Sequence, residues 1–183
     1  HVDLVDDNFI GNRKAVMQLL PKMKVWLDNH AWPYEFSTEA SLNLADDEKL
    51  MSLMQEVGFM SVFVGIESPN EEVLVATQKK QNTRRSIAES CQKIIRHGMI
   101  VNAGYIVGLD QEKTGVAETM LDCIENTQAP IAMAGLLFAL PGTQLSRRLS
   151  KEGRLHEESH LVKVGAGDQC INGLNFETLR PKM

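Results

Sequence analysis

Hydrophobic residues follow two alternating patterns along the chain. Short apolar runs, several rich in β-branched residues, have the length and composition of strands that are buried on both faces. We expect these strands at 2–5, 34–38, 61–66, 101–107 and 132–140. Each run is followed by a segment whose apolar residues recur at helical spacing. We expect these helices at 16–27, 46–57, 83–97, 117–124 and 145–149. A strand that repeatedly alternates with a helix predicts a parallel sheet with right-handed crossovers.

The number and spacing of the strands narrow the fold class. Successive strands end roughly 30 to 40 residues apart, which suits βα modules of a barrel and of an open doubly wound sheet alike. Five strands are too few to close an eight-stranded barrel. We expect an α/β fold that forms a partial parallel (β/α) barrel, truncated and TIM-like, over residues 1–153. The periodic pattern fades after that, so residues 154–183 are expected to form an irregular tail that packs on or near the barrel.

Composition and charge exclude several classes of protein. The chain has 183 residues, 43% of them hydrophobic, and a formal net charge of -5. This mild acidity argues against binding to nucleic acid or to an anionic membrane surface, and no apolar run is long enough for a membrane span. Cys91, Cys123 and Cys170 are too far apart for a paired metal motif and predict reduced thiols in a cytoplasmic protein. Because no initiating Met is present, we expect a piece of a longer chain.

Polar residues concentrate where the predicted strands end, which is where parallel α/β folds bind ligands. Carboxylates there would converge on one rim and would require a cation, a metal or a shared proton. The carboxylates are Asp6, Asp7, Glu39, Glu67 and Asp110. Asp110 is also typical of a helix cap or a turn. Glu39 and Glu67 directly follow apolar strands, which favours a ligand role for both.

These rim segments resemble a known family. Val5-Asp6-Asp7-Asn8-Phe9 opens a series of motifs that continues at 36–45, 64–69, 104–108 and 139–143. In this order and at module spacing they resemble the core of radical S-adenosylmethionine (SAM) proteins, and most closely the group with an N-terminal cobalamin-binding domain. The tail around Gly167-Asp168 and Asn175-Phe176 looks similar to the same group.

The resemblance implies a six-module partial barrel, of which about five modules are present here. In that family a CxxxCxxC loop after the first strand holds a 4Fe–4S cluster, and the cluster binds the amino and carboxylate groups of SAM. One electron cleaves the sulfonium to methionine and a deoxyadenosyl radical. The implied cofactors are SAM, the 4Fe–4S cluster and, for the closest group, cobalamin. The implied reaction is a radical modification or a methyl transfer on a small-molecule substrate that the sequence does not identify.

The resemblance also implies roles for individual residues. The motif Asp6-Asp7-Asn8 matches the segment that contacts the methionine amino group, a cation that suits a carboxylate. Glu39, with Ser41 beside it, matches an acidic position that contacts the ligand's polar end or ribose. The remaining residues match the ribose, carboxylate and adenine contacts: Glu67 and Ser68 for the ribose, Lys79 or Lys80 for the carboxylate, and Gly104, Ile106, Gly108, Leu140 and Pro141 for adenine.

The chain departs from the family pattern in one respect: it contains no CxxxCxxC motif. The resemblance therefore places the cluster loop upstream of His1, and we expect this fragment to lack the cluster and to be inactive alone. Its partners would be the upstream cluster-loop module and a cobalamin-binding domain of the same polypeptide. An exposed sheet edge at 2–5 would favour dimerisation, a covering tail or poor solubility.

Two other interpretations explain part of the pattern. A metal-dependent barrel hydrolase or aldolase would use Asp6, Asp7, Glu39 and Glu67 as ligands for a hard cation. That hypothesis leaves the ordered motifs unexplained, and no histidine stands at a predicted strand end. A non-catalytic scaffold of the same fold would have no need for a mouth lined with carboxylates.

Overall fold

A computed structural model describes most of the chain. The described residues are 1–76, 82–83, 85–110, 112, 114–156, 161–164 and 171–174. Their contacts divide the chain into two compact units. The first unit comprises His1–Tyr105 and Gly115–Gly135, and the second comprises Ile106–Thr114 and Leu136–Met183. The predicted division at residue 153 stays a prediction.

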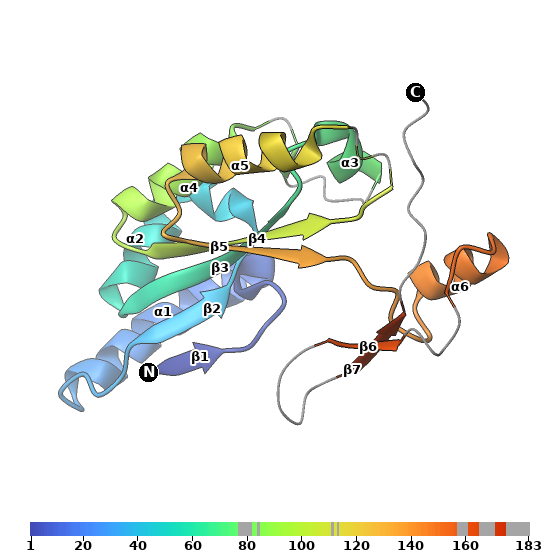
Figure 1. Ribbon diagram of the computed structural model, residues 1–183. Coiled ribbons are helices and arrows are strands. Elements are labelled where there is room, and N and C mark those ends of the chain that lie inside the picture. The colour runs from blue at the N-terminus through green and yellow to red at the C-terminus, as the bar shows by residue number, and fades with distance from the viewer. Residues whose placement is uncertain are drawn as a thin grey trace. The chain divides into compact units, whose positions relative to one another are not determined.

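A five-stranded sheet organises the chain. Its strands are β1 Val2–Leu4, β2 Phe36–Glu39, β3 Phe59–Glu67, β4 Ile100–Val107 and β5 Ile131–Leu136. The order in the sheet is β1-β2-β3-β4-β5. The pairs β1–β2, β2–β3 and β3–β4 are parallel, and β5 runs in the same direction (Figure 1). Each strand therefore lies beside the next one in the chain. A doubly wound sheet reverses its strand order near the middle, so this order decides for barrel-type winding and confirms the predicted fold class.

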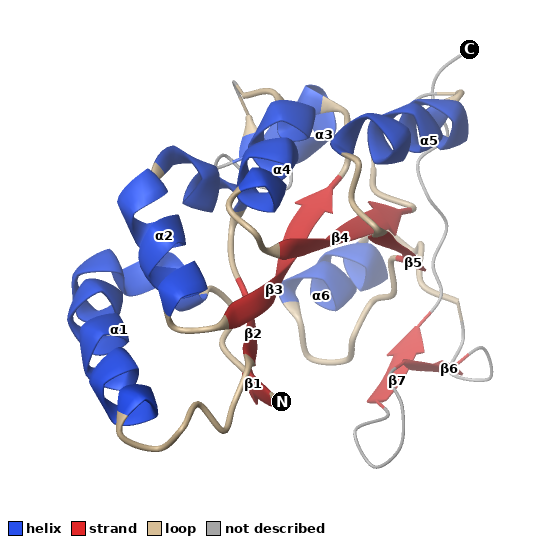
Figure 2. Ribbon diagram, turned by 90° about the vertical axis from the view of Figure 1, so that its left-hand side faces the viewer, coloured by secondary structure: helices blue, strands red, loops and turns tan. Residues whose placement is uncertain are grey.

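Helices follow the strands and cover one face of the sheet. They are η1 Phe9–Asn12, α1 Arg13–Asp28, η2 Leu42–Asp46, α2 Glu48–Glu56, α3 Glu71–Ala76, α4 Ile87–Arg96 and α5 Val116–Thr127. Figure 2 shows α1, α2, α4 and α5 arranged around the same side of the strands. No described helix has the length and apolar character needed to cross a membrane.

The two faces of β3 differ in burial because successive side chains of a strand point in opposite directions. Val62, Val64 and Ile66 are fully buried on the helix side, as is expected for a hydrophobic core. Phe63 and Glu67 alternate with them and are partly exposed on the other face. The core of the first unit is therefore between sheet and helices, while the opposite face of β3 remains accessible to ligands.

Two element boundaries differ from the predictions, and a short polar side chain that caps a helix explains the first of them. Helix α4 begins at Ile87 and not at residue 83, since the Ser86 hydroxyl accepts a hydrogen bond from the Glu89 amide at 3.2 Å. Strand β5 ends at Leu136 and not at residue 140. The segment after it turns instead, with the Thr143 amide donating to the Leu140 carbonyl at 3.3 Å.

The second unit contains helix α6, Gln144–Lys151, and an antiparallel pair of strands, β6 Leu161–Val164 and β7 Ile171–Leu174. Asp110, expected in a cap or a turn, lies in a turn, and its carboxylate forms ion pairs with Arg148 at 3.0 Å and with the buried Arg154. Hydrogen bonding to Asp110 raises the pKa of the Arg154 guanidinium above its ordinary value. This ion-paired group holds the segment after β4 to the segment after α6.

Candidate functional site

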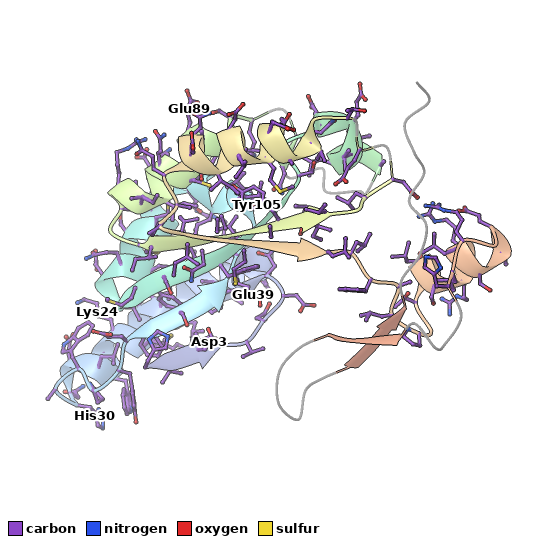
Figure 3. The ribbon with its side chains drawn as sticks, in the orientation of Figure 1. Asp3, Lys24, His30, Glu39, Glu89 and Tyr105 are labelled. Atoms are coloured by element: carbon purple, nitrogen blue, oxygen red, sulfur yellow. The ribbon has the colours of Figure 1, made fainter. Side chains whose placement is uncertain are left out.

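A small pocket lies at the carboxyl ends of β1, β2 and β3, within the first unit. Its volume is about 140 Å³. It is lined by Asp7, Asn8, Glu39, Ala40, Ser41, Phe63, Gly65 and Glu67. Glu39 ends β2, and Figure 3 shows it at that end of the strand. Complete pockets for drug-sized ligands measure about 300 Å³ or more, so this pocket suits one polar end of a larger molecule.

The charge of this pocket is negative. Three carboxylates, those of Asp7, Glu39 and Glu67, line it, and no lysine, arginine or histidine is among its lining residues in the described part of the chain. Carboxylates accept hydrogen bonds, and they do so most strongly from cationic donors. The pocket therefore favours a ligand that presents an ammonium group or several hydroxyl groups.

Glu67 occupies a strained turn at the end of β3. Its φ angle is +69°, and it is not a glycine. The Ser68 amide donates a hydrogen bond to the Ile66 carbonyl at 2.9 Å, which closes a three-residue γ-turn around Glu67. The pairing of β3 with β4 shifts register between Gly65 and Glu67. Backbone strain of this kind concentrates at functional sites, and here it coincides with a pocket carboxylate.

The loops after β1 and β2 are held together by Asn8. Its side-chain oxygen accepts hydrogen bonds from the Ser41 amide at 3.0 Å and from the Ser41 hydroxyl at 3.1 Å. The Asn8 amide itself donates to the Asp6 carboxylate at 2.9 Å. The structure thus brings together Asn8 and Ser41, two of the predicted site residues, and Asp7 lies between the hydrogen-bonded Asp6 and Asn8. Asp6 is exposed and bonds within its own loop.

Phe63 provides the aromatic part of the pocket, and Gly104 on β4 makes room for it. A Cβ atom built on Gly104 would lie 2.5 Å from the Phe63 Cζ atom, which is well below the van der Waals contact distance of two carbon atoms. The sequence predicts that the bare backbone of Gly104 approaches a ligand. In this structure the Phe63 ring occupies the space beside that backbone, and the predicted ligand contact stays a prediction.

The other predicted site residues are not among the residues that line this pocket in the described part of the chain. Ser68 is fully buried, and its hydroxyl accepts a hydrogen bond from the Asn70 amide at 3.2 Å. Ile106, Gly108 and Leu140 belong to the second unit. Lys79 and Lys80 lie outside the described residues. The ligand contacts predicted for these residues remain predictions.

Sequence reasoning did not select Phe63, Gly65 and Ala40 for the pocket. The sequence did contain a signal for Phe63 and Gly65. They stand four and two positions before Glu67 on the same strand, and residues at such spacing share one face. Ala40 directly follows Glu39 and lines the pocket from the start of the loop after β2.

The described cysteines do not fit a cluster or metal site. Cys91 is buried on α4, as predicted, and burial raises its pKa to about 12. Burial also raises the pKa of Cys123, whose sulfur lies 3.9 Å from the Tyr105 hydroxyl. Thiolates are the form that ligates iron, and burial disfavours it at both residues. Across the described ranges, no three His, Cys, Asp or Glu side chains come together as a metal site; Cys170 falls outside them.

Comparisons with known proteins place this fold and site in context. No family model matches the chain. It is 49% identical over 158 residues to an uncharacterized methyltransferase of Synechocystis sp., an alignment that covers 86% of this chain and 30% of the relative. It is 40% identical over 164 residues to the hopanoid C-2 methylase of Rhodopseudomonas palustris, covering 89% and 31%. The chain thus spans about a third of the length of these curated relatives.

A solved structure decides the fold. The radical SAM methyltransferase TsrM of Kitasatospora setae, with cobalamin and a [4Fe-4S] cluster bound, superposes with a TM-score of 0.68 at 18% identity. The match covers 90% of this chain and 33% of that enzyme. The chain has the radical SAM fold. A second structure of TsrM, with tryptophan and a SAM analogue bound, superposes on this radical SAM fold with a TM-score of 0.70.

The resemblance read from the motifs is therefore confirmed. The structural neighbours are radical SAM enzymes, and the homologues are methyltransferases. The pocket described above lies at the carboxyl ends of the strands of this radical SAM fold, which is the face where parallel β/α barrels place their active sites.

Proposed function

We propose that this chain forms part of the SAM-binding barrel of a radical SAM methyltransferase. The observation that carries the proposal is the pocket at the ends of β1, β2 and β3, with three carboxylates and no cationic side chain lining it in the described part. SAM offers an ammonium group and two ribose hydroxyl groups, and these are the donors that such a pocket selects. The kinship with two methyltransferases supports the reaction type.

Within this proposal the residues divide into two groups. Glu67 and Glu39 accept hydrogen bonds from the polar groups of SAM, and Asp7 does so from the loop after β1. Asn8 and Ser41 hold the two loops at a constant distance through their mutual hydrogen bonds. The Phe63 ring excludes water from one wall of the pocket. Pre-organised acceptors of this kind reduce the entropy lost on binding.

The remaining cofactors belong to other parts of a longer polypeptide in this proposal. A reduced 4Fe–4S cluster would supply the electron that cleaves SAM, and cobalamin would carry the methyl group. As the family resemblance implies, the cluster loop and a cobalamin domain would precede this segment. The substrate would be a small molecule, and the isolated chain would be inactive.

The experiment uses the full-length polypeptide that contains this chain. The protein is reconstituted anaerobically with iron and sulfide, supplied with reductant and SAM, and assayed for 5′-deoxyadenosine and S-adenosylhomocysteine. Glu67→Gln keeps the size of the side chain and removes its charge. The matched control is Glu56→Gln, which makes the same change at an exposed position on α2.

The expected result is turnover of SAM by the unchanged enzyme and by Glu56→Gln, with SAM affinity reduced about 10-fold or more in Glu67→Gln, as for the loss of one charge-assisted hydrogen bond. A folded, cluster-loaded protein that neither binds SAM nor forms either product refutes the proposed function. Equal SAM affinity in the two variants refutes the role of Glu67.

A further inference from the structure

Asn82 is hydrogen-bonded to the same turn at the end of β3. The residue is only 2% exposed. Its side-chain nitrogen donates hydrogen bonds to the Gly65 carbonyl at 2.9 Å and to the Ile66 carbonyl at 3.1 Å. Both partners are acceptors only, so the nitrogen and not the oxygen of the amide must face them. These two carbonyls directly precede Glu67, at the place where the pairing of β3 and β4 shifts register.

The other polar atom of the Asn82 side-chain amide is its oxygen. The Asn82 side-chain oxygen is buried and unpaired among the described residues. An unpaired buried acceptor destabilises the folded state. The positive φ of Glu67 adds a second cost in free energy. A turn with two such unfavourable features persists only when the surrounding structure holds its backbone in place. Asn82 is placed to do so, because its side chain donates to two carbonyls beside the register shift.

We propose that Asn82 is a positioning residue for the pocket: its amide clamps the γ-turn of β3 and thereby directs the Glu67 carboxylate toward the ligand. This inference rests on the proposed function, because it assumes that Glu67 binds SAM. Asn82 does not line the pocket, so it acts through Glu67. Loss of the clamp lets the turn relax toward a more favourable φ, which moves the carboxylate away from its acceptor position.

The test compares Asn82→Ala and Asn82→Ser with a matched control in the full-length, reconstituted enzyme. The control is Asn29→Ala, which removes the same kind of bond, from the side-chain amide to the Val25 carbonyl at 2.8 Å, at an exposed end of α1. The measured quantities are the KM for SAM, kcat for deoxyadenosine formation and folding by circular dichroism. Each Asn82 variant is also made in a Glu67→Ala background.

Both Asn82 variants are expected to raise the KM for SAM about 10-fold or more, as for a displaced binding group, with a smaller change in kcat. In the Glu67→Ala background the same substitutions should change the KM less than 2-fold, because the group they position is gone. The Asn29→Ala enzyme should match the unchanged enzyme.

An unchanged KM in the Asn82 variants overturns the proposal, as does an equal increase with and without the Glu67 carboxylate. If neither variant folds, hydrogen exchange of the Ser68 amide in the unchanged protein decides. Slow exchange supports a clamped turn, and exchange at the rate of an unprotected amide overturns it. Failure of the unchanged enzyme to bind SAM would refute the proposed function, which the Asn82 comparison alone cannot do.

Discussion

Replacing Gly104 by alanine tests the packing that shapes the pocket. The new Cβ would lie 2.5 Å from the Phe63 Cζ atom and 3.2 and 3.3 Å from the Cε1 and Cε2 atoms. Carbon atoms prefer separations of about 3.5–4.0 Å, so the tip of the ring must retreat by about 1 Å. Phe63 is partly exposed and faces the pocket. Because the ring lines the pocket, we expect its retreat to narrow the space that the ligand would use.

Two opposing effects determine how much Gly104→Ala changes the free energy of unfolding. Overpacking of this kind costs about 1–3 kcal/mol. Replacing glycine by alanine also restricts the unfolded chain, which stabilises by about 0.4–1 kcal/mol where the backbone allows it. On β5, the Cβ that Gly135 would gain has no heavy atom of the described residues within 4 Å, so Gly135→Ala serves as the control. The free energy of unfolding should be lower in Gly104→Ala than in Gly135→Ala by the overpacking cost, about 1–3 kcal/mol.

Urea denaturation followed by circular dichroism measures this difference, and equilibrium dialysis with SAM measures the effect on the site in the full-length enzyme. Combining Gly104→Ala with Phe63→Leu shortens the opposing side chain and should restore much of the lost stability. Equal stability of the two alanine variants would refute the packing of Phe63 against Gly104. A stability loss with unchanged SAM affinity would instead show that the ring can move without narrowing the pocket.

Three further predictions concern single side chains. Glu67→Gly should relieve the positive φ angle and raise the free energy of unfolding by about 1 kcal/mol while weakening SAM binding; a less stable variant would contradict the strain. The pKa of Asp47 is held below its ordinary value by its hydrogen bond to Arg13, so the stability it contributes is present above pH 3.8 and is lost as the pH falls through the lower folded value. Asp47→Asn should flatten acid unfolding in that range, and an unaltered acid-unfolding curve would count against the pair. Cys91, with its pKa raised to about 12 by burial, should react with maleimide only in denaturant; rapid labelling of native Cys91, checked against the half-buried Cys123, would disprove its burial.

Much of the fold and part of the site were predictable from sequence, because local patterns carry that information. Alternating apolar runs and helical stripes identified the βα modules, and parallel strands place their carboxyl ends together. Asp7, Asn8, Glu39, Ser41 and Glu67 were therefore expected at one rim, and all of them line the pocket. The helix start at Ile87 was missed because one serine hydroxyl decided it, and hydrophobic periodicity does not register such a cap.

Tertiary structure decided what depends on pairing between distant strands. The strand spacing suited both a barrel and a doubly wound sheet, and only the order β1-β2-β3-β4-β5 distinguishes them. The strain at Glu67 coincides with a register shift between β3 and β4, which neither strand shows alone. The room that Gly104 leaves for Phe63 likewise exists only when the two strands pair. Sequence determines which groups a segment offers, whereas register and packing determine which of them meet, because those contacts join residues far apart in the chain.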